Sequence, residues 1–319
     1  MVDERVPFVD HHVHLLAVSA RRKWVGDIAQ YHRDVAARGS SPMDEPDDYE
    51  PVDDLPAALR RGLQRAADLG LTGVTEAGMR TWDHWDALVE LRDRDELPID
   101  VGVLVASGAV DDLGRLRAAR EASDDRLQIV GIKFYADGWL GPRTCACTHV
   151  FHDVDPPNDG ILFQDADRLA SRIDPLARDG FRPATHAIGD RAMDAVLDAY
   201  EQVYGGADGV RAARPRIEHA QLLRDDLIAR IAELGVVCCI QPCFAASDAP
   251  HVEHGLGDDY PLAYRWDRLI AAGAEVIAGS DFPIETLDPA VGIEHLMSGP
   301  HPLDRETATR IMTTPIATG

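Results

Sequence analysis

The stretch Phe8-Val9-Asp10-His11-His12-Val13-His14 joins an apolar strand, predicted at residues 6–9, to a cluster of histidines. His12 and His14 are two residues apart, and such residues point to the same side of an extended strand. Two imidazoles that project together suit one metal ion, because neutral imidazole is a common zinc ligand. A solvated polar strand end could have the same sequence pattern, so the interpretation depends on residues further along the chain.

Composition limits the class of protein. The 319 residues are 45% hydrophobic, which suffices for a buried core and argues against disorder. A formal net charge of −23 argues against nucleic-acid binding, which usually needs a basic face. No apolar run reaches the roughly 18 residues of a membrane span. The acidic amino-terminal residues do not resemble a secretory signal and the five cysteines are an odd count, so we expect a cytoplasmic protein.

Lysine is rare in this chain. Only two of the 32 basic residues are lysines, Lys23 and Lys133. Because arginine otherwise supplies the positive charge, a retained lysine suggests chemistry that needs a neutral amine. Chance retention is a competing explanation. Lys133 is the stronger candidate, since it lies near the end of an apolar run.

Strand-like apolar runs alternate with helical patterns. The runs predict strands at residues 6–9, 73–75, 99–105, 128–135, 181–185, 215–217, 236–240 and 275–278. Apolar residues spaced three or four apart predict helices at residues 55–69, 83–91, 113–122, 165–177, 192–204, 225–234 and 262–272. A glycine suited to a left-handed cap follows four of these helices, at Gly70, Gly180, Gly235 and Gly273.

Eight strand–helix repeats predict a single (β/α)8 TIM-barrel domain over residues 1–319. A doubly wound open sheet is the alternative. The first strand is not followed by the Gly-x-Gly-x-x-Gly pattern, which counts against a dinucleotide-binding fold.

Two segments are long for a simple repeat. Residues 15–51 hold Trp24, Tyr31 and His32 before a run rich in Gly, Ser, Pro and Asp, and they predict a lid over the pocket. Residues 138–160 follow the fourth strand. Thiol and imidazole groups in this second segment suggest a further metal site, although their spacing fits no standard zinc module: Cys145, Cys147, His149 and His152.

In such a barrel the chemistry lies at the carboxyl ends of the strands. Residues that can bind metal gather there: His12, His14, Lys133, His186, Glu218, His219 and Asp281. Scattered surface histidines would not be expected to fall so consistently at strand ends. Glu76 and Gln241 end the second and seventh strands and are candidates for the pocket wall.

Three further residues near these strand ends admit two interpretations. Arg143 could bind a substrate carboxylate or be a solvated loop arginine. Asp190 could support a residue of the site or contact substrate, but an N-cap or first-turn residue of the following helix is the simpler interpretation. Asp137, with Gly138, is predicted to form a turn.

The chain resembles the amidohydrolase superfamily, in particular the family 3 branch of N-substituted formamide deformylase and related N-acyl hydrolases. The matching stretches are PFVDHHVHL, VGIKFYADGWLGPRT, THAIGDRAMDAVLDAY, RIEHAQLL, the pair Gln241-Pro242, and AGSDFPIETLDP. They run from residue 7 to about residue 289, so the resemblance covers most of the chain.

The resemblance implies a centre of two divalent ions, most simply Zn²⁺, at the barrel mouth. The ligands that it implies are His12, His14, Lys133, His186, His219 and Asp281. Lys133 would be carboxylated and bridge the two ions, and a single ion would remain if its amine were unmodified. Asp281 would bind the more buried ion, hold a bridging hydroxide and act as general base and acid.

The expected activity is hydrolysis of a C–N bond in an amide, an N-acyl compound or a cyclic amide. A deaminase, or a lactone or ester hydrolase with the same metal site, is the alternative enzyme, and a non-catalytic binding barrel is the alternative class. The candidate substrate-binding residues are Glu76, Arg143, Gln241 and Trp24. The expected partner is a small-molecule substrate rather than nucleic acid or membrane, and a homo-oligomer is compatible with the sequence.

The sequence departs from the family at its ends. The family usually adds a small β-sandwich, built from strands before the first motif and after the last helix. Here seven residues precede Phe8 and 38 follow Asp281. We therefore expect a barrel that lacks the sandwich and has a shortened lid. Because the lid and the loops carry specificity, the sequence identifies the metal site better than the substrate.

Overall fold

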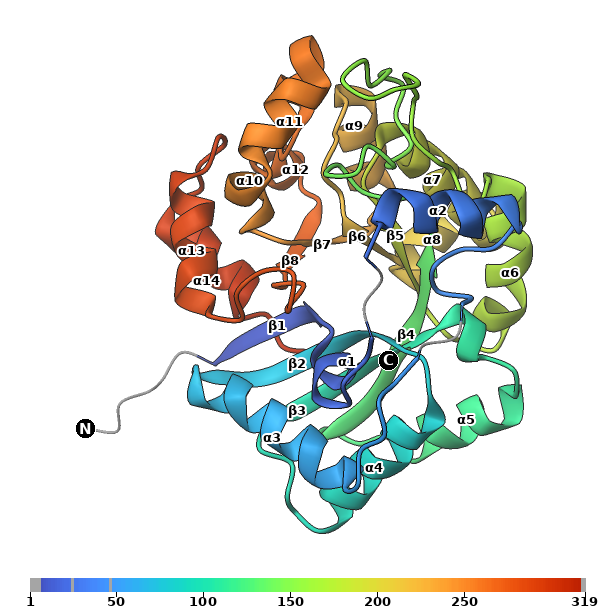
Figure 1. The fold of residues 1–319 in the computed structure, drawn as a ribbon, viewed down its shortest axis with the longest axis vertical. Coiled ribbons are helices and arrows are strands. Elements are labelled where there is room, and N and C mark those ends of the chain that lie inside the picture. The colour runs from blue at the N-terminus through green and yellow to red at the C-terminus, as the bar shows by residue number, and fades with distance from the viewer. Residues whose placement is uncertain (1–6, 24–25, 46–47, 317–319) are drawn as a thin grey trace.

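Eight parallel strands form one sheet in chain order, and helices surround it (Figure 1). The computed structural model describes residues 7–23, 26–45 and 48–316. The strands are β1 (Phe8–Val13), β2 (Leu71–Met79), β3 (Asp100–Ala106), β4 (Leu127–Tyr135), β5 (Pro183–Ala187), β6 (Arg216–His219), β7 (Val237–Ile240) and β8 (Glu275–Ala278). Strand order never reverses, which confirms the predicted (β/α)8 barrel and excludes the doubly wound sheet.

The predicted strands are all present, and β8 has the predicted bounds. The largest differences concern the first two strands. β1 continues to Val13, so that His12 lies inside the strand, and β2 extends the predicted core of three residues to nine. The predicted strand ended at Thr75, before the polar residue Glu76, yet both residues are buried in the barrel.

The predicted helices are present with shifts of a few residues at their ends. They are α3 (Leu55–Asp68), α4 (Trp82–Asp93), α5 (Leu113–Glu121), α6 (Ala166–Arg178), α7 (Asp190–Tyr204), α9 (Asp225–Leu234) and α12 (Trp266–Ala271). Aspartate N-caps start several of them; the Asp54 carboxylate, for example, accepts a hydrogen bond from the Ala57 amide. The four glycines predicted as caps have positive φ angles, 90° at Gly70, 83° at Gly180, 64° at Gly235 and 87° at Gly273.

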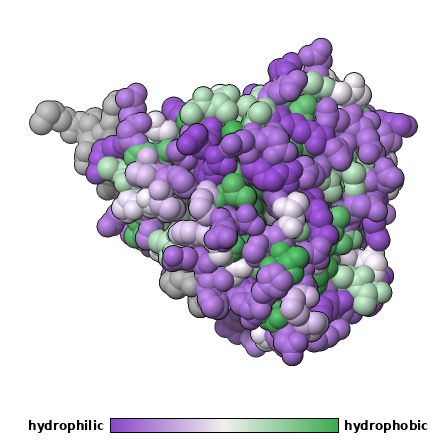
Figure 2. Space-filling view, turned by 90° about the horizontal axis from the view of Figure 1, so that it is seen from above, coloured by the Kyte–Doolittle hydropathy of each residue, from purple (hydrophilic) through white to green (hydrophobic). Residues whose placement is uncertain are grey.

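Further helices lie in segments where no helix was predicted. They are α1 (Leu15–Ser19), α2 (Ile28–Ala37), α8 (Ala207–Ala213), α10 (Phe244–Ser247), α11 (Ala249–Leu256), α13 (Pro289–Ser298) and α14 (Arg305–Met312), with short 3-10 turns η1 (Ser107–Ala109) and η2 (Gly257–Leu262). Among the described residues, no helix is long and apolar enough to cross a bilayer. The face shown in Figure 2 is mainly hydrophilic, with apolar residues scattered over it.

The segment after α14 closes the barrel at the amino-terminal ends of the strands. The His11 ring donates a hydrogen bond from Nε2 to the Thr314 carbonyl oxygen, at 2.9 Å. Ile316 packs inside the barrel against Leu104 and Val130. Glycine leaves the room for this side chain, because a Cβ atom at Gly102 would lie 3.1 Å from Ile316.

The barrel closes between its last and first strands at the opposite, carboxyl end. The Asp281 amide donates to the His12 carbonyl oxygen and the His14 amide donates to the Phe282 carbonyl oxygen, both at 2.7 Å. Gly279 allows this contact, since a Cβ atom there would lie 2.4 Å from the His12 nitrogen. These two backbone hydrogen bonds form a seam between the last and first strands that brings His12, His14 and Asp281 together.

Gly279→Ala should test the seam. The added methyl group meets rigid backbone, so the free energy of unfolding should fall by about 2–3 kcal/mol, as overpacking of a core typically costs. Gly26→Ala is the matched control, because no atom lies within 4 Å of the added methyl group. Denaturant titration of the two variants and the parent protein measures the difference, and equal stability of Gly279→Ala and the parent would contradict the close approach.

Candidate active site

A cavity of about 250 Å³ opens at the carboxyl ends of the strands. The six residues predicted as metal ligands all line it: His12, His14, Lys133, His186, His219 and Asp281. They come from five different strands or from the residues that follow them. The structure thus brings the predicted set to one place, as expected for the carboxyl end of such a barrel.

The imidazole rings lie close to one another. Ring centroids are 5.4 Å apart for His12 and His14, 5.0 Å for His12 and His219, and 4.4 Å for His186 and His219. The Asp281 Oδ1 atom lies 3.1 Å from His14 Nε2 and 3.6 Å from His12 Nε2. Potential ligand atoms of His12, His219 and Asp281 all lie within 4.8 Å of each other.

Four buried polar atoms of this set have no hydrogen-bond partner among the described residues: Lys133 Nζ, His186 Nδ1, His219 Nδ1 and Asp281 Oδ1. Most buried polar atoms in proteins are hydrogen-bonded, so each exception calls for an explanation. Nitrogen and carboxylate ligands are the donors that zinc and similar ions prefer. The residues present therefore fit the divalent metal that the resemblance implies.

A buried carboxylate orients His12. Glu218 Oε2 accepts a hydrogen bond from His12 Nδ1 at 2.6 Å, which leaves the Nε2 lone pair available to the cavity. Arg216 donates to the other oxygen of Glu218, with Nε at 2.9 Å. Burial opposes ionisation of Glu218, but Arg216 and Lys133 hold the pKa of this carboxyl group well below its usual value.

His186 is oriented by its surroundings in the same way. Its Nε2 donates to the Gly138 carbonyl oxygen at 2.8 Å, and the Tyr135 ring stacks on the imidazole with centroids 3.8 Å apart. Asp137 is not simply the predicted turn residue. Its carboxylate is fully buried and accepts from the amides of Ala146, at 2.9 Å, and Gly189, at 2.8 Å, so it ties two loops together beside His186.

The backbone is unusual at two of the predicted ligands and at a residue next to one of them. His219, Ala220 and Asp281 have φ angles of 78°, 47° and 59°, a region that residues other than glycine rarely adopt. Such conformations cost free energy and persist where the surrounding structure imposes them, often at functional sites. They turn His219 and Asp281 toward the cavity.

Of the predicted substrate-binding residues, the three that the structure describes, Glu76, Arg143 and Gln241, are not among the residues that line the cavity. Glu76 lies behind His14, where its Oε2 accepts from the Leu16 amide at 2.9 Å and its Oε1 lies 3.8 Å from His14 Nδ1. Gln241 is buried and donates to the Cys239 carbonyl oxygen at 3.1 Å. Trp24 lies outside the described residues.

Arg143 also has a different place from the one expected. Its Nη2 lies 2.7 Å from an oxygen of Asp153, and its Nη1 donates to the Leu140 carbonyl oxygen at 2.8 Å. This guanidinium is buried and holds its own loop together, so it is neither a solvated arginine nor part of the cavity wall.

Part of the segment predicted as a lid lies on the cavity wall. Its lining residues are Arg22, Ile28, Tyr31, Pro42 and Met43. His32 fixes α2 to the loop after β4, because its ring lies edge-on to Trp139 at 4.4 Å and its Nδ1 pairs with Thr144 Oγ1 at 2.8 Å. Movement of this segment during turnover stays a prediction.

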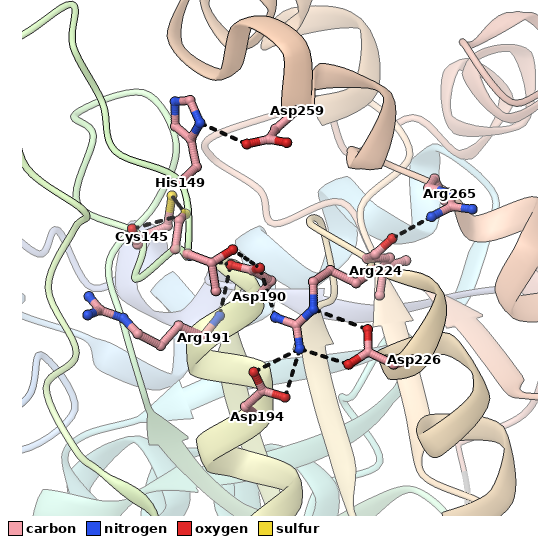
Figure 3. A network of polar contacts seen from close by, with 12 residues as sticks. Cys145, His149, Asp190, Arg191, Asp194, Arg224, Asp226, Asp259 and Arg265 are labelled. Atoms are coloured by element: carbon pink, nitrogen blue, oxygen red, sulfur yellow. Dashed lines mark hydrogen bonds and ion pairs between the residues drawn. The ribbon is translucent and has the colours of Figure 1, made fainter.

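The ligand atoms of the cysteine and histidine residues at positions 145–152 do not point to one place. Cys145 and Cys147 have their sulfur atoms 3.5 Å apart, but both ring nitrogens of His149 are engaged elsewhere, with Asp259 and the Gly255 carbonyl oxygen (Figure 3). His152 joins no metal-binding group found among the described residues. The structure therefore gives no support to a further metal site in this loop.

Asp190 is a first-turn residue of α7, as one interpretation of the sequence had it, but it is not the N-cap. Gly189 is the N-cap of α7, and the Asp190 carboxylate instead accepts from the amide and the hydroxyl group of Thr148, at 2.8 and 2.5 Å. Arg224 lies between Asp190, Asp194 and Asp226 (Figure 3). This network fastens the long loop after β4 to α7 and to the start of α9.

Sequence reasoning gave no role to several residues that shape the site. Asp10 Oδ1 accepts from the amides of His12 and Ser280, at 3.1 and 2.9 Å, and so supports the seam. The sequence placed Glu218 at a strand end but gave no sign of its contact with His12. Its position before a ligand at a strand end is a usable signal, because metal-binding histidines commonly have carboxylate partners.

Comparison with known proteins agrees with this geometry. A model of the amidohydrolase family matches residues 39–317. The protein YtcJ of Bacillus subtilis (strain 168) is 36% identical over 198 residues, which cover 62% of this chain and 36% of YtcJ. N-substituted formamide deformylase of Arthrobacter pascens is 32% identical over 126 residues, which cover 38% of this chain and 22% of that enzyme. The matched part is thus a minor share of each relative.

Among solved structures, an uncharacterized metal-dependent hydrolase from Pyrococcus furiosus matches with a TM-score of 0.76. The match covers 96% of this chain and 80% of that one, at 23% sequence identity, and so shows a shared fold. The family model spans most of the chain and confirms the resemblance inferred from the motifs. The chain belongs to the amidohydrolase family, and its barrel has the same fold as that hydrolase.

Proposed function

We propose that this protein is a metal-dependent hydrolase that cleaves a C–N bond in a small amide, N-acyl compound or cyclic amide. The observation that carries the proposal is the set of six ligand-type side chains on one cavity, three of them with buried nitrogen atoms that lack a partner. A cavity of about 250 Å³ suits a small molecule. Membership of the amidohydrolase family supports the same conclusion.

Three of the four imidazoles favour the neutral form, which is the form that binds a cation. Burial, and then the charge of Lys133, lower the pKa of His12 to about 4, and burial lowers the pKa of His186 and His219 well below the usual value. These rings are therefore neutral at pH 7 and offer lone pairs. Together with His14, Asp281 and Lys133 they would hold one or two divalent ions. When bound, such an ion activates water as a nucleophile and polarises the scissile carbonyl group.

Asp281 is the proposed general base and acid. Burial opposes its ionisation, but His12 and His14 outweigh that effect and lower the pKa of its carboxyl group. At neutral pH the carboxylate is ionised and can accept a proton at an oxygen that faces the cavity. Release of that proton to the departing nitrogen would complete hydrolysis of an amide.

Lys133 is the proposed bridge between two ions, as a carbamate. Its side chain is 1% exposed, and burial lowers the pKa of its amine to about 8. The neutral fraction at pH 8 is therefore much larger than for an exposed lysine. A neutral Nζ can attack the carbon of CO₂ and lose a proton, which gives a carbamate with two oxygen ligands. An arginine could not react in this way.

Hydrolysis by zinc-loaded protein tests the proposal. Each chain should bind at least one ion and release amine from one or more of a set of formamides, N-acyl amino acids and cyclic imides. Asp281→Asn should lower kcat by about 10²–10⁴, the usual contribution of a general base. Asp198→Asn, on the exposed side of α7, is the matched control and should keep full activity. Stoichiometric metal with no turnover would favour a non-catalytic binding barrel. Turnover of lactones alone would exclude hydrolysis of a C–N bond as the activity.

Glu218→Gln should weaken metal binding by about 10–100-fold, the usual effect of losing a carboxylate behind a histidine ligand. The amide group cannot both accept from His12 and satisfy Arg216. Glu275→Gln is the matched control, because Glu275 also pairs with an arginine but lies at the start of β8. Titration with a zinc indicator measures both affinities. An unchanged zinc affinity in Glu218→Gln would show that His12 does not depend on this contact.

The carbamate can be detected directly. Protein incubated with ¹³C-bicarbonate and zinc should show one ¹³C carbamate resonance, which Lys133→Ala and Lys133→Arg both abolish. Lys23→Ala removes the other lysine, which is exposed and paired with Asp48, and should leave the resonance unchanged. Metal content should fall in both Lys133 variants. A single ion per chain with an unmodified Lys133 amine would contradict the two-metal centre.

A further inference from the structure

Another cavity lies toward the amino-terminal ends of the strands, opposite the proposed active site. Its volume is about 40 Å³, and it shares no lining residue with the larger cavity. Three arginines line it: Arg182, which precedes β5, Arg214, which precedes β6, and Arg216, the first residue of β6. Guanidinium groups gathered around one small cavity repel one another, so they need negative charge nearby.

Two of the three arginines have a carboxylate partner. Arg214 pairs with Glu275, at the start of β8. Arg216 donates from Nε to Glu218 Oε1 at 2.9 Å, and from Nη2 to the His11 carbonyl oxygen at 3.1 Å. These two ion pairs leave one positive charge at the cavity without a counter-charge.

Arg182 carries the remaining charge. Among the described residues, no hydrogen bond or ion pair engages its guanidinium group, and the residue is half-buried. Burial, and then the charges of Arg216 and Arg214, lower the pKa of Arg182. Because an arginine stays protonated in spite of such a shift, its charge is unfavourable here unless an anion compensates it.

The rest of the cavity wall is largely apolar. Val130, Val237 and Ile277 line it from β4, β7 and β8, and Pro315 and Ile316 line it from the segment after α14. Apolar walls lower the local dielectric constant, which strengthens the attraction between an anion and the arginines. They also offer a surface that a short alkyl group can cover. A planar guanidinium group matches a carboxylate, to which it can donate two parallel hydrogen bonds.

We propose that this cavity binds a short carboxylate, such as acetate or propionate. The carboxylate group accepts hydrogen bonds from Arg182 and Arg214, and the alkyl group lies against Val237 and Ile277. A cavity of about 40 Å³ has room for only a few water-sized groups, which limits the ligand to this size. The proposal does not rest on the proposed hydrolase function, because the two cavities are separate.

Nuclear magnetic resonance of the full chain, loaded with zinc and labelled with ¹⁵N-arginine, tests the site. The Nε–Hε resonances of Arg182 and Arg214 are assigned by their absence from Arg182→Gln and Arg214→Gln. Titration with sodium acetate at constant ionic strength should shift both resonances of the parent protein until they saturate. These resonances report on the arginine cavity itself, so acetate bound elsewhere on the protein does not enter the measurement.

Two changes of charge should move the acetate affinity in opposite directions. Arg182→Gln should weaken it by about tenfold, as read from the Arg214 resonance, because a charge-assisted hydrogen bond is lost. Glu275→Gln should strengthen it by about threefold, because it removes a negative charge that also engages Arg214. Arg94→Gln is the matched control, since Arg94 is exposed and pairs with Glu90, and it should leave the affinity unchanged.

Several results would overturn the proposal. Sodium chloride might shift the resonances as acetate does, which would reduce the effect to screening of charge. Tighter binding of inorganic phosphate than of acetate would make this a phosphate site. An unchanged acetate affinity in Arg182→Gln or in Glu275→Gln would place the ligand elsewhere. If Arg182→Gln does not fold, the comparison of Glu275→Gln with the parent protein still decides, and no readout depends on turnover.

Discussion

The site depends on the backbone seam between the last and the first strand. Two hydrogen bonds of 2.7 Å, from Asp281 to His12 and from His14 to Phe282, join segments about 270 residues apart in the chain. Gly279 makes the approach close enough. Because these two hydrogen bonds join main-chain atoms, the side chains of His12, His14 and Asp281 remain available for a ligand. The strand order places the other three proposed ligands, on β4, β5 and β6.

The sequence alone was sufficient for the fold and for the six proposed ligands. Strand periodicity located all eight strands, and the rule that barrel chemistry lies at strand ends then selected His186 and His219. That inference needs only local pattern, because parallel strands in chain order bring equivalent ends together. Lys133 stood out for a compositional reason, and it does lie on the cavity wall.

Contacts between distant segments were not predictable in the same way. Glu218 and His12 are 206 positions apart, and no local pattern shows that they pair. Arg143 looked like a substrate ligand because it is a loop arginine near a strand end, but a partner ten residues away, Asp153, occupies its guanidinium. The helices α1 and α2 were not predicted. α1 has only five residues, too few for a periodic pattern, and α2 is stabilised by tertiary contacts such as that of His32 with Trp139.

Ile316 bears on how a ligand can reach the cavity. Together with Leu104 and Val130 it fills part of the barrel interior, whereas the cavity opens at the carboxyl ends of the strands. If the proposed hydrolysis takes place in that cavity, substrate would enter and product would leave at the carboxyl ends. A bound product would then exclude the next substrate, as a competitive inhibitor does.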